Sequence, residues 1–331
     1  MTLYRVYQYP AKRQVELGAG ISTAYGSWIA PGAQIAAYVR SGGVQTNILT
    51  ELSQKTQLTL NAGLAQCRAG MGDIVLVAHD HAENVASADQ MSNLVAGTRI
   101  MGLGYGNLRP TFTWTATAAS FLLDVANVQL HNCILRLAGP VGTTALTVTA
   151  PITVSGAGCQ INNCEINWGV DADQLCTIGI TTQATADQFV FANNRCFAAA
   201  DGGATTFLQL VGSDHAVISG NEIVGGTSAV AVGPIRFITT DSLHVSMVNN
   251  YIRNSLTAST GCVTVAAGAT SSSGRVDYLH LSTLANGANQ LVLGHADGAW
   301  AASAAAFNFG RFINVANLDG ERAAEVTVVS A

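Results

Sequence analysis

A six-residue pattern recurs along this chain and constrains its fold more than any other feature. Its six positions hold, in order, an apolar residue, any residue, Asn or Gly, Asn or Cys, any residue and a second apolar residue. The first copy matches this pattern less well than the others. Counted at the third position, the copies are 30, 31, 30, 27 and 29 residues apart. The third positions are Gly102, Asn132, Asn163, Asn193, Gly220 and Asn249. Such a period predicts stacked structural repeats.

The residues between these copies favour strands. They form short runs of Val, Ile, Thr and Phe, which Gly, Ser and Asp interrupt, and helical solenoids lack such runs. Leucine-rich repeats need a leucine skeleton that is absent here, and propeller blades need a period of about 40 residues or more. We therefore predict an all-β, right-handed parallel β-helix with coils of about 27–31 residues.

The third position of the pattern suits a sharp bend between two strands. Asn and Gly tolerate the left-handed backbone conformation that such bends need. Stacked Asn side chains also hydrogen-bond along a stack of strands. We expect a structural ladder with a gap at Gly220, formed by Asn132, Asn163, Asn193 and Asn249. If this ladder is interior, Asn163→Asp buries a charge and destabilises the fold by several kcal/mol.

The repeat divides the chain into three parts. Residues 57–295 form the β-helix, and a short helix over 59–70 caps its first coil, because Leu60, Leu64 and Cys67 share one helical face. Residues 1–56 lack the period and form an attachment arm. Residues 296–331 form a C-terminal cap and tail, with a short helix over 299–306 and a last strand over 325–329.

Three segments resemble the opening of pectin-lyase-like β-helix proteins. They are LNAGLAQCRAG (60–70), GDIVLVA (72–78) and RIMGLGYGNLRP (99–110). The Asn-rich turns that follow are similar to turns of the same superfamily, and the resemblance covers about 57–290. It implies the architecture, since the superfamily holds pectate lyases, glycosidases, phage tailspikes and structural virion proteins. The run GLGYGNLRPTFTW (102–114) most resembles β-helix proteins encoded among phage structural genes.

Composition limits the partners. Charged residues make up 11% of the chain and the net charge is −5, whereas globular proteins carry about 25% charged residues. This balance excludes a nucleic-acid partner, which needs clustered Lys and Arg. No apolar run approaches the about 20 residues of a membrane span. No signal peptide is apparent, so we expect synthesis in a host cytoplasm.

Cysteine usage points to packing and not to chemistry. The seven cysteines are an odd number and form no C-x-x-C motif. This pattern fits neither a zinc site nor a disulfide framework. We expect reduced cysteines that fill the core.

The acidic residues do not form an evident active site. Polysaccharide lyases of the superfamily use clustered Asp residues for calcium and a Lys or Arg base. The acids between 165 and 245 are scattered, Asp171-x-Asp173 is their only tight pair, and the region has no Lys, so the bases left are Arg195, Arg236 and Arg253. Glu165 and Glu222 lie two turns apart, which is not a special glycosidase geometry.

Three further motifs contain residue types that occur in functional sites. His79-Asp80-His81 with Glu83 is either a two-histidine metal site or, as we favour, an exposed loop. Asp214-His215 imitates part of a catalytic triad, but no G-x-S-x-G accompanies it. Gly102-x-Gly104-x-x-Asn107 is no dinucleotide fingerprint, because no helix pattern follows it.

Three tryptophans have two plausible roles at the surface. Trp114, Trp168 and Trp300 could stack on sugars, as aromatic residues do in tailspikes, or pack at a subunit interface. We favour the interface.

Together these features predict a non-catalytic bacteriophage virion protein. We expect a capsid decoration or head-spike protein that is trimeric and contacts virion proteins such as the major capsid protein. No catalytic, cofactor-binding or metal-binding residue is predicted. The alternative is a tailspike-type protein that binds a host-surface glycan or depolymerises polysaccharide.

Overall fold

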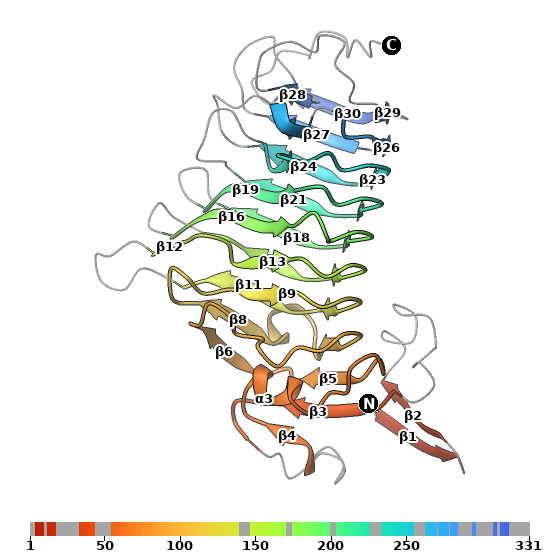
Figure 1. Ribbon diagram of the computed structural model, residues 1–331. Coiled ribbons are helices and arrows are strands. Elements are labelled where there is room, and N and C mark those ends of the chain that lie inside the picture. The colour runs from red at the N-terminus through yellow and green to blue at the C-terminus, as the bar shows by residue number, and fades with distance from the viewer. Residues whose placement is uncertain are drawn as a thin grey trace.

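The structure is a computed structural model of the 331-residue chain. It describes residues 4–9, 12–17, 33–43, 54–138, 146–169, 174–198, 203–225, 233–254, 262–269, 271–277, 279–283, 293–295, 307–309 and 312–317. Figure 1 shows the described chain as coils stacked from the N-terminal to the C-terminal end. This arrangement is a parallel β-helix.

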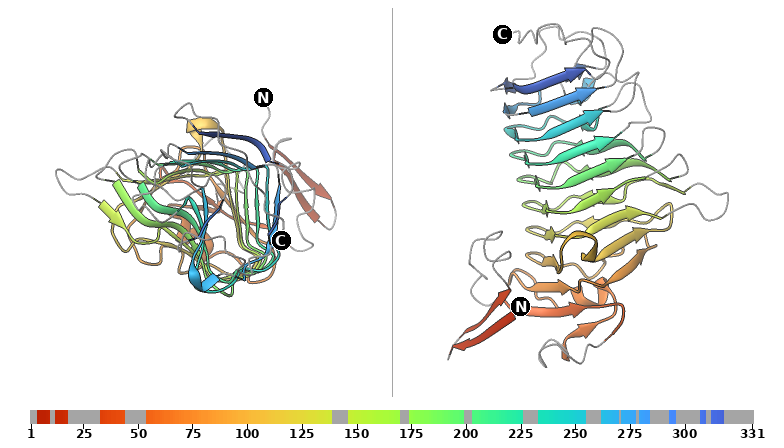
Figure 2. Two further views of the ribbon diagram at one scale, coloured as in Figure 1. Left: turned by 90° about the horizontal axis from the view of Figure 1, so that it is seen from above. Right: turned by 180° about the vertical axis from the view of Figure 1, so that it is seen from behind.

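Three parallel sheets run along the stack, and each coil contributes strands to them. The described residues form sheets of 11, 9 and 8 strands. Seen from above, the sheets surround one interior (Figure 2). We call them the first, second and third sheets.

The strands of each sheet are given in spatial order. The first sheet contains β4 (Thr56–Gln57), β3 (Ile35–Val39), β5 (Ile74–Val77), β7 (Arg99–Gly102), β10 (Gln129–His131), β14 (Gln160–Asn162), β17 (Val190–Ala192), β20 (Val217–Ser219), β23 (Val245–Val248), β26 (Gly274–Asp277) and β29 (Phe307–Phe309). The second sheet contains β6 (Ala82–Val85), β8 (Thr111–Trp114), β11 (Ile134–Leu137), β15 (Glu165–Asn167), β18 (Arg195–Ala198), β21 (Glu222–Gly225), β24 (Tyr251–Asn254), β27 (Leu279–Thr283) and β30 (Phe312–Asn317). The third sheet contains β9 (Phe121–Leu123), β13 (Ile152–Val154), β16 (Gln174–Thr182), β19 (Gly203–Leu210), β22 (Ile235–Phe237), β25 (Val263–Val265) and β28 (Leu293–His295), and β12 (Leu146–Val148) also pairs with β16.

The register of the first sheet confirms the sequence repeat. The first apolar residue of each copy pairs with its equivalent in the next coil. This column runs Ile100, Leu130, Ile161, Phe191, Ile218 and Met247. All six side chains are buried, so the period of the sequence is the length of one coil.

Left-handed turns bound the first sheet on both sides. The predicted turn positions Asn132, Asn163, Asn193 and Asn249 have φ between 54° and 57°, and Gly220 has a φ of 65°. A second column, five residues earlier in each coil, was not predicted. It has φ values between 57° and 80° at Gly97, Asn127, Gly158, Gln188, His215 and His244. In both columns most backbone amides donate to a carbonyl of the next coil, as Asn132 does to Asn162 and His215 to Leu243.

The tryptophans lie in the core, so both surface roles considered for them are wrong for Trp114 and Trp168. Each is fully buried, and their rings meet edge to face with centroids 5.4 Å apart. Side chains alternate along a strand, and β8 shows this pattern, with Phe112 and Trp114 buried and its two threonines less so. Trp300 lies outside the described residues.

The predicted cap helix is present but shorter than expected. Helix α3 spans Leu60–Leu64, and the Thr59 hydroxyl caps it by accepting from the Ala62 amide. It packs on β3 at the end of the stack, where Gly63 faces Val39 and Val75. Leu60 and Leu64 bury their side chains under this end of the solenoid.

The first sheet extends beyond the range 57–295. Strand β3 lies in the expected arm yet pairs in parallel with β5, and β29 and β30 continue the sheets past residue 295. Strands β1 (Tyr4–Tyr9) and β2 (Lys12–Leu17) form a separate antiparallel hairpin. The predicted helix over 299–306 and the strand over 325–329 lie outside the described residues. No helix in the described part of the chain is long and apolar enough to span a membrane.

Candidate functional site

A hydrogen-bonded Asn stack lies inside the solenoid, one position after the predicted ladder. Asn194, Asn221 and Asn250 are buried. Asn221 donates to Asn250 Oδ1 (2.9 Å) and accepts from the Asn194 side chain (3.1 Å). Each of the three side chains also donates to a carbonyl of the preceding coil, at 2.8–2.9 Å.

The predicted ladder residues lie elsewhere. Asn193 and Asn249 are exposed, and Asn132 and Asn163 are half-buried. The Asn132 side chain donates to the carbonyls of Gly102 and Gly104 (2.8 and 3.0 Å). These four residues shape the turns. The large loss of stability expected from Asn163→Asp therefore applies to substitutions in the buried Asn stack and not to Asn163.

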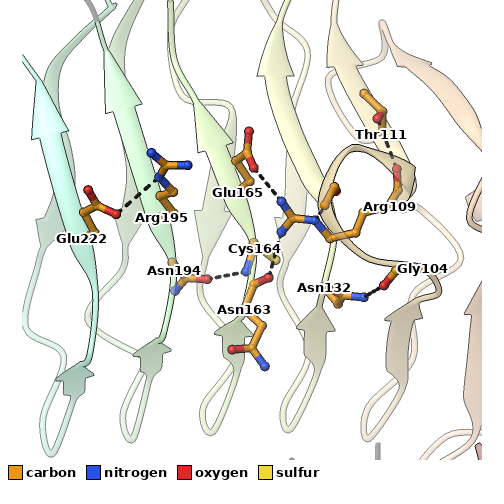
Figure 3. A network of polar contacts seen from close by, with 11 residues as sticks. Gly104, Arg109, Thr111, Asn132, Asn163, Cys164, Glu165, Asn194, Arg195 and Glu222 are labelled. Carbon is orange, nitrogen blue, oxygen red and sulfur yellow. Dashed lines mark hydrogen bonds and ion pairs between the residues drawn. The ribbon is translucent and has the colours of Figure 1, made fainter. Parts of the chain in front are cut away.

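Cysteines continue the buried stack toward the N-terminus. Cys164 donates its backbone amide to Asn194 Oδ1 (2.9 Å; Figure 3). Cys133 occupies the equivalent place one coil earlier, because Ile134 and Glu165, the residues that follow the two cysteines, are register partners. Burial raises the pKa of the Cys164 thiol to about 11, and it also raises the pKa of the Cys133 thiol well above its usual value. All seven cysteines are free thiols, and only Cys67 is not buried. The prediction that the cysteines pack in the core is therefore confirmed, with Cys67 only partly buried.

The second sheet carries ion pairs on its outer face. Arg109 Nη2 contacts Glu165 Oε2 at 2.6 Å, and Arg195 Nε contacts Glu222 Oε2 at 3.3 Å (Figure 3). Glu165, Arg195 and Glu222 are register partners in successive strands. An Arg therefore lies between the two carboxylates, which do not face each other across an open site.

Arg109 also holds the loop between β7 and β8, which contains the short helix η1 (Gly106–Leu108). Its guanidinium donates to the carbonyls of Gly106 (2.8 Å) and Asn163 (3.3 Å). The loop presents Tyr105 to solvent with 79% of its surface exposed. It is thus fixed at its base and apolar at its tip.

Removing this guanidinium should free the loop. We expect Arg109→Ala to speed chymotrypsin cleavage at Tyr105 several-fold while lowering the free energy of unfolding by only about 1 kcal/mol. Limited proteolysis followed by mass spectrometry measures the cleavage, and Arg195→Ala is the matched control. Equal cleavage in both variants would show that Arg109 does not hold the loop.

The His79–Glu83 segment is partly the exposed turn that we favoured. His79 and Asp80 are exposed in that turn, and Asp80 pairs with Arg40. His81 points inward and contacts Glu83 (2.9 Å), whose carboxylate also accepts the backbone amide of Leu60 (2.7 Å) at the start of α3. Glu83 therefore anchors the cap helix. The two histidines do not share a face, and the described residues contain no group of three or more His, Cys, Asp or Glu suited to a metal.

Other carboxylates also join coils. Asp187 accepts the backbone amide of Asp214 (3.0 Å), and Asp214 accepts that of Leu243 (2.7 Å).

Asp73 binds the Arg68 guanidinium at 2.7 Å. This contact, together with two backbone amides, holds the pKa of the Asp73 carboxyl below its usual value despite its burial. Asp171 and Asp173 lie outside the described residues.

His131 is a buried histidine that sequence reasoning did not single out. Burial lowers its pKa to about 4, and the Asn163 amide lies 3.5 Å from its ring nitrogens. The neutral ring is therefore the form that the fold accommodates.

This burial makes stability depend on pH. An unfolded His has a pKa of about 6.5, so between about pH 6.5 and 4 the unfolded chain binds the extra proton. The free energy of unfolding should therefore fall by about 2–3 kcal/mol as the pH drops through this window. We expect His131→Gln to lack that part of the dependence in urea unfolding at pH 7.5 and 4.5, whereas His79→Gln keeps it. Equal pH dependence in wild type and His131→Gln would contradict the assignment.

Comparison of the chain with protein-family models, curated proteins and solved structures found no match.

Proposed function

We propose that this chain is a non-catalytic structural protein of a bacteriophage virion. In this proposal it is a capsid decoration or head-spike protein that works as a homotrimer and contacts other virion proteins, such as the major capsid protein. It would be made in the host cytoplasm and carried in the particle.

The use of the carboxylates carries the proposal. A β-helix enzyme needs acidic side chains that are free to meet a substrate. Here Glu165 and Glu222 are paired with arginines, Glu83 anchors the cap helix, and Asp187 and Asp214 bind amides of the following coils. These contacts stabilise the stacked coils, and a component of a virion needs such stability.

Two further observations support a virion role. The run over 102–114 most resembles β-helix proteins encoded among phage structural genes. The low share of charged residues, 11%, suits a surface that packs against neighbours.

Copy number tests the proposal. Particles purified from cells that carry this gene are analysed by quantitative gel, and the purified chain is analysed by light scattering. We expect hundreds of copies per particle and a trimer in solution. A chain that is absent from the particles would overturn the proposal.

A tailspike role is the second candidate, and it is favoured by the exposed Tyr105 on the loop that Arg109 holds, since aromatic faces stack on sugar rings. A handful of copies at the tail would support this role. Release of reducing ends from host polysaccharide, lost in Glu165→Gln or Glu222→Gln, would identify a depolymerase.

A further inference from the structure

We propose that His215 and His244 form a binding site for a divalent transition-metal ion of the zinc, nickel and copper class. The two residues occupy equivalent positions in consecutive coils, in the unpredicted turn column. Both are exposed. Their ring centroids lie 4.8 Å apart, and the ring planes differ by 19°.

The backbone fixes the two side chains as a parallel pair. Their φ values are 57° and 58°, so both Cα–Cβ bonds leave the turn in the same direction. The amide of His215 donates to the Leu243 carbonyl (2.7 Å), which ties the first histidine to the residue before the second. The Ser273 hydroxyl accepts the amide of His244 (3.3 Å). Much of the ordering that a metal site needs is therefore supplied by the stacked coils.

The ring separation is close to what a metal ion requires. Zinc–imidazole bonds are about 2.0–2.1 Å long, so two nitrogens bound to one tetrahedral ion lie about 3.3 Å apart. Exposed rings 4.8 Å apart reach this separation by tilting toward each other. Imidazole selects zinc, nickel and copper over magnesium and calcium, which prefer oxygen ligands. Two protein nitrogens bind the ion, and water completes its coordination.

The local charge favours a cation. Asp214 precedes His215, and its carboxylate accepts the amide of Leu243, the residue before His244 (2.7 Å). This carboxylate therefore lies near both histidines without being counted as a ligand. This proposed metal site stands or falls independently of the proposed virion role.

Titration of the tag-free chain with ZnCl2, followed by calorimetry, tests the site. The variants are His215→Gln and His244→Gln, with His79→Gln as the matched exposed control. Gln suits these positions, because Gln188 occupies the equivalent place one coil earlier with a φ of 58°. Thermal melting checks that each variant is folded.

We expect one zinc ion per wild-type chain and the same binding in His79→Gln. Each of the other two variants should bind zinc at least tenfold more weakly, because one imidazole is lost. If the wild type binds no stoichiometric zinc, or if both variants keep wild-type affinity, the rings only stack and the proposal is overturned.

Discussion

Asn221→Ala should lower the free energy of unfolding by about 3–4 kcal/mol. Asn221 is the middle member of the buried Asn stack. Its side chain accepts from the amide and side chain of Asn194, and it donates to Phe191 O and Asn250 Oδ1. Alanine would leave the Asn194 amide and the Phe191 carbonyl buried without these partners, and such groups are costly. Urea unfolding followed by circular dichroism measures the loss.

Asn193→Gly is the matched control for this substitution. Asn193 precedes the stack, is exposed and has a φ of 56°, and Gly220 occupies its position in the next coil. We expect the control to stay within about 1 kcal/mol of wild type. If both variants unfolded at the same urea concentration, the interior position of the Asn stack would be refuted.

The stack also shows how far the sequence could predict the structure. Turn positions could be predicted because Asn and Gly are the residues that adopt left-handed backbone readily. The repeat contained a further signal, since Asn or Cys recurs at its fourth position, where Cys133, Cys164 and Asn194 are buried. The side that a side chain faces depends on the bend, which the spacing alone does not determine.

Only half of the second turn column could be predicted from residue type, because Gly97, Asn127 and Gly158 are followed by residues that are neither Gly nor Asn. Gln188, His215 and His244 adopt a left-handed backbone there, although only a few per cent of non-Gly residues do so. Hydrogen bonds between coils hold this conformation: the His215 amide donates to the Leu243 carbonyl, and the His244 amide donates to the Ser273 hydroxyl. Tertiary context therefore overrides local preference, and the His pair becomes visible only after folding.

The buried position of Trp114 could be predicted from the sequence around it. Thr111-Phe112-Thr113-Trp114 alternates between polar and aromatic residues, a strand pattern that places both aromatic side chains inside. Applied to this segment, the alternation would have assigned Trp114 to the core and not to a subunit interface.

Gly179→Ala should lower the free energy of unfolding by about 3 kcal/mol. A Cβ at Gly179 would lie 2.4 Å from Trp168 Nε1 and 2.8 Å from the Phe207 carbonyl oxygen. Neither can retreat easily, because Trp168 is wedged against Trp114 and Phe207 belongs to the paired strand β19. Thermal melting measures the effect, and Thr177→Ala at an exposed position of the same strand is the control.

A double-mutant cycle identifies the cause of this loss. Trp168→Phe removes Nε1, the atom nearest to the new methyl group. It sacrifices no hydrogen bond, because the indole N–H has no partner among the described residues. If the clash is with the indole, Gly179→Ala should cost at least about 1 kcal/mol less in the Trp168→Phe background than in wild type. An equal cost in both backgrounds would assign the loss to the Phe207 carbonyl. If the Gly179→Ala variant had the same melting temperature as wild type, the close packing of this coil would be contradicted.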